Sequence, residues 1–551
     1  MRRKRLHELI DRIALRAKDL FRSLDWPLLL FLVLFLDVKI ICKLIAIVFI
    51  YAFRPDARFG LRRKGSRLPL FYVGMIGIAL VDWLAYRLYA DGNYKITLLC
   101  GILGWTLCLL AIHQVKLSVE LSGAPVLHRT LLIFFAINAV LSFLMLARIM
   151  VETRTINPYT YQGNFQQYFL GTGDYIRGLT FDISSTNAFI NAFGVLYFLY
   201  RKQAAMVLLC MGVLLLTGSN ATTLLLLTAL AWPFFFRSDR EQKSLVVVCC
   251  FLAILFFVKI SPQNHSYVAY RAEQTIKGGK IDDSVVNHIV ARITDRPDSE
   301  LDPEQRRLKI ATQYLDSVSY LFWLSKDSIL RSQGNHSPII ARLPKPNIHR
   351  PEYQREKDTG FIQKKLAQFI SDNGMEQQVN AVGDGCCRVP GKLTALMQTE
   401  KFMAAHPMRL LTGNGLGRFS SKQAFRSTAL GIAGKYPAGW RYIARDFQDR
   451  HLTLYLFYFA HGLELRSMLN APDCVYDQLV AEYGLAGLAI FAFLYIGFFV
   501  RHIRRLSYGV PLLFMLSAGL LTGYWFEQLS IVVLFECMIF LDIKEGGGHE
   551  R

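Results

Sequence analysis

Residues 129–150 read RTLLIFFAINAVLSFLMLARIM, a stretch made almost entirely of apolar side chains. About 20 such residues in a helix are needed to cross the hydrocarbon core of a bilayer. Lipid offers the backbone no hydrogen-bond partners, so a segment of this kind is expected to be helical. Runs of the same character recur along the chain, at 20–36, 38–53, 69–89, 95–115, 130–150, 186–200, 204–218, 221–236, 244–260, 477–500, 510–525 and 528–542. The sequence therefore predicts an all-α polytopic membrane protein with about 12 transmembrane helices.

The positive charge of the chain is arranged in short stretches. Lys and Arg outnumber Asp and Glu by 63 to 42, which gives a formal net charge of +21. Such an excess can indicate nucleic-acid binding, but here the basic residues cluster between apolar runs, as topology signals do. We therefore expect no nucleic-acid partner. The first apolar run is not followed by a small-residue cleavage site, so no removable signal peptide is expected either.

The alternation of charge predicts which connections face the cytoplasm. With the basic N-terminus inside, every second connection should be basic. That pattern holds for 54–67, 116–129, 201–202, 237–243 and 501–505. The connections between them, 91–94, 151–185, 218–220 and 261–475, should then lie outside, and the C-terminal tail inside.

The number of helices in the stretch 27–53 decides which set of connections faces the cytoplasm. One long helix there would bury Asp37 and Lys39 and would place the arginine-rich connection 54–67 outside. Two short helices, or a re-entrant hairpin, turning at Asp37 to Lys39 preserve the charge alternation, and we favour this second interpretation.

These spans divide the chain into three parts. Residues 1–260 should form an N-terminal transmembrane bundle of about nine spans. Residues 261–475 should form one large, mostly helical loop domain outside the cytoplasm, with helices near 392–405 and 441–459. Residues 476–551 should form a C-terminal bundle of three spans.

Two turns next to apolar runs carry residues of chemical interest. Residues 175–194 contain Arg177 at the expected membrane surface, where its planar guanidinium suits phosphate oxygens. An interfacial arginine that only snorkels is the alternative. Residues 217–223 read TGSNATT and are typical of a tight turn.

A third segment, 406–421, reads HPMRLLTGNGLGRFSS and contains Gly413, Gly415 and Gly417. No strand pattern precedes these glycines, so we interpret them as a tight turn that lets the backbone approach another element closely. Arginines in and after the segment are interleaved with aromatic residues, a mixture that suits a sugar linked to phosphate. They are Arg409, Arg418, Arg426, Arg441 and Arg445, with Tyr436, Trp440 and Tyr442. A solvated loop is the alternative for any one of these arginines.

A fourth segment, 470–487, reads NAPDCVYDQLVAEYGLAG and leads into an apolar run. By spacing, Asp473, Tyr476 and Asp477 are expected on one helical face. Asp473 suits two roles: a general base, which needs a carboxylate at a fixed position, or a helix cap after Pro472. The sequence leaves both open.

Together the segments resemble the O-antigen polymerase and ligase superfamily. In that family a Gly-x-Gly loop precedes a motif of the form His-Asn-x-Tyr-Leu-x-x-Leu-x-Glu-x-Gly before the last spans. Gly413 and Gly415 match the loop, and the matches to the second motif are Tyr476, Glu482 and Gly484. Asp473 stands at the histidine position and Cys474 at the asparagine. Ser219, Asn220 and Ala221 replace a ligase-type Ser-Arg-Gly turn, whereas Arg177 is retained ahead of Gly178 and Asn187. These departures favour a polymerase over a ligase.

The resemblance implies an inverting, metal-independent glycosyltransferase with a GT-C-like fold, in a bacterial inner membrane and with its active site facing the periplasm. It would polymerise polyprenyl-diphosphate-linked oligosaccharide repeat units without a cofactor, beside a chain-length regulator and a flippase as candidate partners. Arg177 would bind the diphosphate with one or more of Arg388, Arg418, Arg426 and Arg441. Asp473 would be the base, and Tyr476 would position the acceptor. An O-antigen ligase and a transporter of lipid-linked sugars are the alternatives.

Overall fold

The computed structural model describes residues 23–62, 65–161, 168, 171–236, 238–261, 361–386, 389–432, 434, 436–460, 468 and 470–548. Within these ranges the regular elements are all helices. The chain divides into two compact units. Unit 1 comprises Met1–His265, Ala395–Leu452 and Pro472–Arg551, and unit 2 comprises Ser266–Thr394 and Thr453–Ala471. The basic N-terminal residues 2–5 and the segment 262–360 lie outside the described residues.

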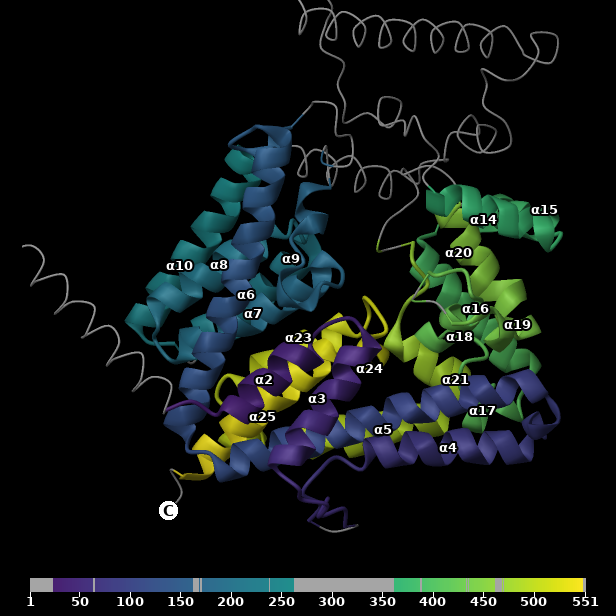
Figure 1. The fold of residues 1–551 in the computed structure, drawn as a ribbon, viewed down its shortest axis with the longest axis horizontal. Coiled ribbons are helices and arrows are strands. Elements are labelled where there is room, and N and C mark those ends of the chain that lie inside the picture. The colour runs from purple at the N-terminus through teal and green to yellow at the C-terminus, as the bar shows by residue number, and fades with distance from the viewer. Residues whose placement is uncertain are drawn as a thin grey trace, which may run out of the picture. The chain divides into compact units, whose positions relative to one another are not determined.

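Each predicted apolar segment coincides with a helix or a run of helices in unit 1 (Figure 1). They are α2 (Trp26–Phe35), α3 (Ile40–Phe53), α4 (Phe71–Ala85), α5 (Gly92–Leu121), α6 (Ala124–Thr153), α7 (Ser184–Tyr200), α8 (Ala204–Leu216), α9 (Asn220–Phe236), α10 (Arg240–Leu255) with η6 (Phe256–Ile260), α21 (Val475–Ile490) with η13 (Phe491–Ile496) and α22 (Gly497–Val500), α23 (Gly509–Gly519) and α25 (Ser530–Gly548).

Four helices of the described residues are long and apolar enough to cross a membrane, namely Gly92–Leu121, Ala124–Thr153, Arg240–Ile260 and Val475–Arg505. Shorter apolar helices make up most of the rest. The expected connection 116–129 is largely helical, because α5 and α6 extend until only a turn at Ser122 and Gly123 separates them. The sequence-based boundary was wrong there, since an apolar pattern marks the lipid-facing length and a helix continues past it.

The two-helix interpretation of 27–53 is confirmed. α2 and α3 pack against each other and are joined by a turn at 36–39. At 10 and 14 residues, or about 15 and 21 Å, neither reaches the ~30 Å of a hydrocarbon core. Asp25 caps α2 by accepting from the Leu28 amide at 3.1 Å, and its carboxylate also lies 2.7 Å from Arg54 at the end of α3. The two open ends of the hairpin are thus tied together.

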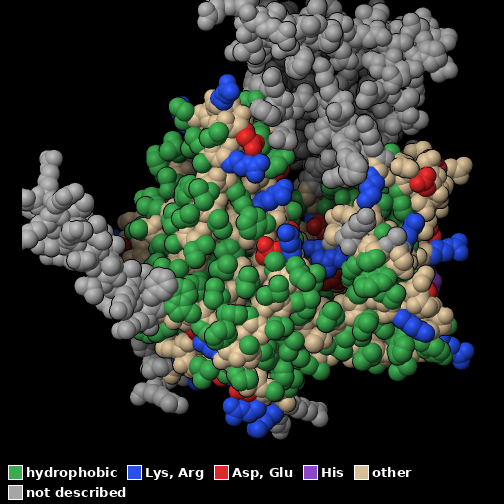
Figure 2. Space-filling view, in the orientation of Figure 1, with side chains coloured by type: hydrophobic (Ala, Val, Ile, Leu, Met, Phe, Trp, Pro, Cys, Tyr) green, Lys and Arg blue, Asp and Glu red, His purple; other side chains and the backbone are tan. Residues whose placement is uncertain are grey.

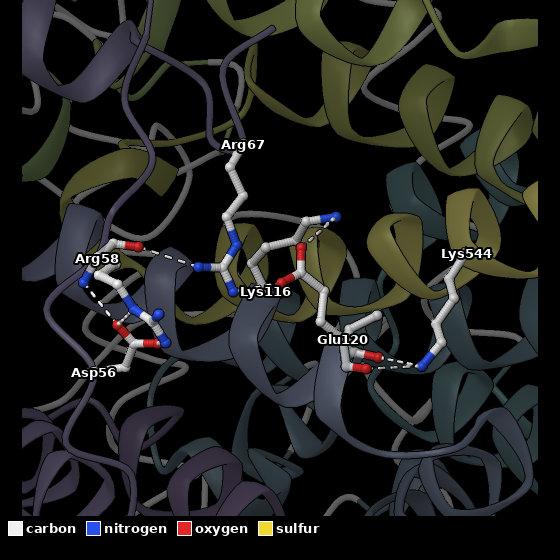
Figure 3. Close-up of polar contacts among 7 residues, drawn as sticks. Asp56, Arg58, Arg67, Lys116, Glu120 and Lys544 are labelled. Atoms are coloured by element: carbon white, nitrogen blue, oxygen red, sulfur yellow. Dashed lines mark hydrogen bonds and ion pairs between the residues drawn. The ribbon is translucent and has the colours of Figure 1, made fainter.

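Basic connections meet at one end of the helices (Figure 3). Arg67 pairs with Glu120 near the end of α5, and the Lys116 ammonium lies 3.5 Å from the same carboxylate. Lys544 of α25 donates to the carbonyl oxygens of Glu120 at 3.3 Å and Ser122 at 2.7 Å, so its charge caps the C-terminus of α5. Connections 54–67 and 116–129 and the end of the last helix therefore share one location.

The remaining connections of the predicted cytoplasmic set show the same kind of contact. Arg501 donates to the Ser66 carbonyl at 3.1 Å, Arg201 pairs with Glu545, and Lys202 pairs with Asp239. Each contact joins two basic connections, or one of them to the end of α25.

Within the described residues, the connections that are expected outside the cytoplasm contact one another and not the basic connections. Val38, in the turn of the hairpin, donates its amide to the Thr180 carbonyl at 2.8 Å. Gln528 donates to Asp182 at 3.3 Å, and Tyr94 donates to the Leu416 carbonyl at 3.0 Å. The two sets that alternate in charge along the sequence are therefore also separated in the structure.

Most of the last described helix, α25, is deeply buried in unit 1. Each residue from Ile531 to Leu541 is at most 1% exposed. The helix packs against α5, α6, α7, α23 and α24 (Figure 1). Its carboxylate at Glu536 accepts hydrogen bonds from the Tyr72 hydroxyl and, at 3.1 Å, from the Tyr495 hydroxyl. Both bonds go to Oε1 and reduce the cost of burying this polar group, whereas Oε2 has no hydrogen-bond partner among the described residues.

Unit 2 contains α14 (Phe361–Asp372), α15 (Glu376–Cys386) and α20 (Thr453–Phe459), which pack together. α16 (Gly391–Ala405) begins in this unit and continues into unit 1. α16 matches the helix expected at 392–405, whereas helical structure in 441–459 begins only at Arg445. The segment expected as one loop domain, 261–475, is divided between the units, and its part Ala395–Leu452 belongs with the membrane-type helices.

Candidate functional site

The glycine-rich loop and α21 form a single structure, which we call the clasp. The carboxylate of Glu482, fully buried in α21, accepts four backbone N–H groups of the loop. The donors are Gly417 at 2.8 Å, Phe419 at 2.9 Å, Ser420 at 3.0 Å and Ser421 at 3.1 Å. In the other direction, Asn414 and Gly415 donate their amides to the α21 carbonyls of Ala481 at 2.9 Å and Glu482 at 3.1 Å. Charge-assisted bonds of this kind fix the loop firmly.

Glycine is required where the clasp is tightest. Gly413 has φ +93° and ψ −166°, a conformation open essentially to glycine, and a Cβ there would come within 2.3 Å of the Glu482 carbonyl carbon. Gly484 interrupts the regular α21 backbone with φ +64°, and its Cβ would meet the Leu411 carbonyl at 2.4 Å. The prediction of a tight turn that allows a close backbone approach is confirmed.

The clasp holds a short helix, α18 (Lys422–Ser427), directly after the loop. Ser421 caps it by accepting from the Ala424 amide at 3.1 Å. Lys422 and Arg426, four residues apart, lie on the same face of this helix. The loop thus presents two cations from one helical face.

Lys422 is nearly completely buried, at 7% exposure. Burial and, second, the charge of Arg426 lower the pKa of Lys422 to about 8. Asp182, Glu527 and Asp473 act on that pKa in the opposite direction, so carboxylates from three further segments lie near this ammonium. We call these five residues the α18 cluster.

Glu527 connects the cluster to α21. It lies on α24 (Trp525–Gln528), between the last two long apolar segments, and accepts from the Gln423 amide at 2.7 Å and from Gln478 of α21 at 2.5 Å. Burial, and then the charge of Glu482, raises the pKa of Glu527 to about 7. A carboxyl group with such a pKa can exchange a proton near neutral pH.

Lys43 lies in the first turn of α3, next to the turn of the α2–α3 hairpin. Its ammonium donates to the carbonyls of Phe35 at 2.6 Å and Asp37 at 2.7 Å and to the Ser530 hydroxyl at 3.3 Å. These bonds satisfy its donors, while Lys422, Asp182 and Arg426 are close enough to interact with its charge. Figure 2 shows Lys and Arg side chains gathered with Asp and Glu side chains in the middle of the visible face, beside α18 and α24.

Asp473 does not occupy the position that the sequence indicated. α21 begins at Val475 with Cys474 as its N-cap residue, so Asp473 stands one residue before the cap and outside the helix. The expected shared helical face with Tyr476 and Asp477 is therefore wrong, as is the capping alternative. The chain is extended at Cys474, with φ −155° and ψ 127°, and this delays the helix.

The Asp477 carboxylate and the Tyr476 hydroxyl, which belong to the same segment, both have partners inside the protein. Asp477 Oδ2 lies 2.6 Å from His451 Nε2, with both side chains fully buried. Among the described residues, His451 Nδ1 and Asp477 Oδ1 have no hydrogen-bond partner. The Tyr476 hydroxyl donates to the Ser517 carbonyl of α23 at 2.7 Å.

Of the predicted diphosphate arginines, the structure brings Arg426 into the α18 cluster. Arg177 is exposed; its guanidinium stacks over Tyr175 and donates to the Asp174 carbonyl at 3.3 Å. Arg418 stacks on Tyr94 at the start of α5, at 5.3 Å from the ring centroid. Arg441 is exposed. Arg388 lies outside the described residues.

Sequence reasoning missed Lys422, Glu527 and Lys43. Lys43 and Glu527 carried a signal, because each is a charged residue isolated within or between apolar runs, and such residues mark functional sites in membrane proteins. Lys422 carried none, because a lysine in a polar loop is ordinarily solvated.

Comparisons with protein-family models, with curated proteins and with solved structures found no match to this chain.

Proposed function

We propose that this chain is a multi-pass protein of a bacterial cytoplasmic membrane that polymerises polyprenyl-diphosphate-linked oligosaccharide repeat units at the periplasmic face. The α18 cluster carries the proposal. It combines a buried ammonium, that of Lys422, and a half-buried guanidinium, that of Arg426, with carboxylates at the end of the helices opposite to the basic connections. A transferase acting on such donors needs these two kinds of group.

The two kinds of group divide the chemistry between them. As the bond between sugar and diphosphate breaks, negative charge develops on the leaving diphosphate, and fixed cations stabilise it. A carboxylate removes the proton from the attacking hydroxyl of the acceptor sugar. Asp473 is our candidate base, because it stands where the resembling family has histidine and its charge acts on Lys422.

The clasp explains how a loop far away in sequence becomes part of the site. Glu482 and Gly484 match the second family motif, and Gly413 and Gly415 match the first. Their direct contact gives these positions one purpose, which is to fix α18 against α21. Precise fixing of this kind is what transition-state stabilisation demands.

The basic end should face the cytoplasm, and this orientation is testable by cysteine labelling. In a variant without the native cysteines, we expect Ala57→Cys, in the connection 54–67, to resist a membrane-impermeant maleimide in intact cells with a permeabilised outer membrane. Ile156→Cys, 90% exposed in the alternate set, should be labelled. The opposite pattern would invert the topology and would move the α18 cluster to the cytoplasmic side.

The function itself is tested by deleting the gene and separating the surface polysaccharides on gels. Glycan limited to single repeat units is the result expected for a polymerase. Free lipid-linked polymer would indicate a ligase instead, and a lack of translocated units would indicate a flippase. Extension of purified lipid-linked repeat units by the reconstituted protein provides the direct measurement.

A further inference from the structure

A groove of about 790 Å³, which we call the basic groove, opens between the connection 54–67 and the end of α5. α3 and α5 pack against each other, and both end at this groove, with Phe53 and Leu121 as their last residues. Figure 2 shows Lys and Arg side chains gathered near the bottom of the view, where Figure 1 shows the connection. The groove lies at the opposite end of α3 from Lys43, and so apart from the α18 cluster.

One wall of the basic groove is apolar. Phe53 is 62% exposed and Leu121 is 66% exposed, and both line the groove. Contact with water makes such exposure unfavourable, whereas contact with lipid chains does not. Each of the two residues ends an apolar helix, at the level where a membrane helix passes from the hydrocarbon core to the headgroup layer. The wall is therefore placed to contact the part of a lipid chain nearest its headgroup.

Two guanidinium groups line the same groove, those of Arg58 and Arg67. Arg67 donates to the Arg58 carbonyl at 3.1 Å and pairs with Glu120 of α5, so its position is fixed (Figure 3). The Arg58 side chain is 89% exposed, and its Nε and Nη2 donate to Asp56 at 3.1 and 3.0 Å. Within the described part of the chain, Nη1 of Arg58 has no hydrogen-bond partner. An oriented guanidinium with a free edge suits the oxygen atoms of a phosphate.

Cations outnumber carboxylates around the basic groove. The basic side chains that line it or contact its lining residues are Arg54, Arg58, Arg67, Lys116 and Lys544, and the carboxylates are Asp25, Asp56 and Glu120. The carboxylates orient the arginines without neutralising the groove. An excess of two positive charges remains to attract an anion.

The general preference of cytoplasmic connections for Lys and Arg accounts for the charge but not for its arrangement. A topology signal requires no fixed geometry. Arg67, in contrast, joins two segments of the chain through its bonds to residue 58 and to Glu120, beside the apolar wall. Basic pockets between membrane helices are typical binding sites for anionic lipid headgroups.

We propose that the basic groove binds an anionic phospholipid of the surrounding bilayer. Its phosphate would contact Arg58 and Arg67, and an acyl chain would lie against Phe53 and Leu121. A phospholipid carries both features, whereas free phosphate lacks the chain and a zwitterionic lipid lacks the net charge. The inference requires that the helices lie in a bilayer, and it does not depend on sugar transfer.

Lipid binding is measured by native mass spectrometry of the full-length protein in detergent, with phosphatidylglycerol and phosphatidylcholine of identical chains added in equal amounts. We expect the wild type to prefer phosphatidylglycerol roughly tenfold, and Arg58→Gln combined with Arg67→Gln to abolish the preference. Arg58→Lys should keep part of it, because the charge remains but the planar fork is lost. Arg504→Gln, at an exposed arginine of the basic connection 501–505, is the matched control and should bind like the wild type.

A second variant separates binding from folding. Arg58→Gln alone removes an exposed ion pair, which contributes little to stability, so its melting temperature should equal that of the wild type. Its affinity for phosphatidylglycerol should nevertheless fall about fivefold, the effect expected from one basic residue at an anionic surface. Wild-type affinity in this variant would overturn the inference, as would equal retention of the two lipids by the wild type.

Inorganic phosphate and the control variant test the remaining explanations. Displacement of phosphatidylglycerol by an equimolar amount of inorganic phosphate would indicate a site for the free anion and would overturn the inference. A loss of preference in Arg504→Gln equal to that in Arg58→Gln would indicate attraction to the whole basic end, with the same consequence. Repeat-unit extension plays no part in these measurements, so the lipid site and the proposed polymerase can each fail without the other.

Discussion

Replacing Glu482 with alanine is expected to release the loop 417–421 from α21 and to lower the melting temperature markedly. Four backbone N–H groups lose their acceptor. A buried donor left unsatisfied costs about 1–3 kcal/mol, so we expect the free energy of unfolding to fall by at least ~3 kcal/mol. Because α18 follows the loop directly, transfer activity should be lost too. Thermal melting and limited proteolysis of the purified protein measure the structural part.

Two further variants make this prediction specific. In Glu482→Gln the remaining oxygen can still accept from Phe419, Ser420 and Ser421, while the new amide opposes the Gly417 N–H, so an intermediate loss is expected. Glu400→Ala removes an exposed carboxylate from α16 and should melt like the wild type. A wild-type melting curve for Glu482→Ala would show that the loop does not depend on this carboxylate.

Asp473→Asn is expected to reduce glycan chain formation on the order of 10²-fold or more while leaving stability unchanged. Removing a proton acceptor has an effect of this size. Stability should persist, because Cys474 and not Asp473 occupies the N-cap position of α21, so no cap is lost. The measurement is the rate of extension of lipid-linked repeat units by the purified variant, together with its melting temperature.

Glu527→Gln is the matched comparison, since Glu527 is a second carboxylate near Lys422 and burial raises its pKa to about 7. A wild-type rate of repeat-unit extension by Asp473→Asn would contradict the role of Asp473 as general base. If Glu527→Gln lost activity under the same conditions, the base would be Glu527.

The helices were largely predictable from the sequence, because lipid imposes the same apolar demand on every crossing segment. The hairpin of α2 and α3 followed from Asp37 and Lys39 in an otherwise apolar run. Helix ends were less accurate: α5 and α6 extend through polar residues around His113 and His128, where hydropathy falls but the helix does not stop.

The site was predictable only in part. Gly413 and Gly415 indicated a close backbone approach, but the element that is approached, α21, comes almost 70 residues later in the sequence. Lys422 and Glu527 become significant through tertiary contacts that no local pattern encodes. Asp473 was assigned to a helix by its spacing, and a single extended residue, Cys474, was enough to remove it from that helix.

The central position of α25 has a consequence for how the protein is made. The ribosome produces this helix after the other described helices, yet several of them pack around it. Until it arrives, the Ser530 hydroxyl is missing from Lys43 and Lys544 is missing from the end of α5. Before α25 inserts, the surfaces against which it packs must therefore be covered by lipid or by the insertion machinery. A chain terminated before Ser530 would keep those surfaces uncovered by α25 and would be recognisable to membrane proteases as unfinished.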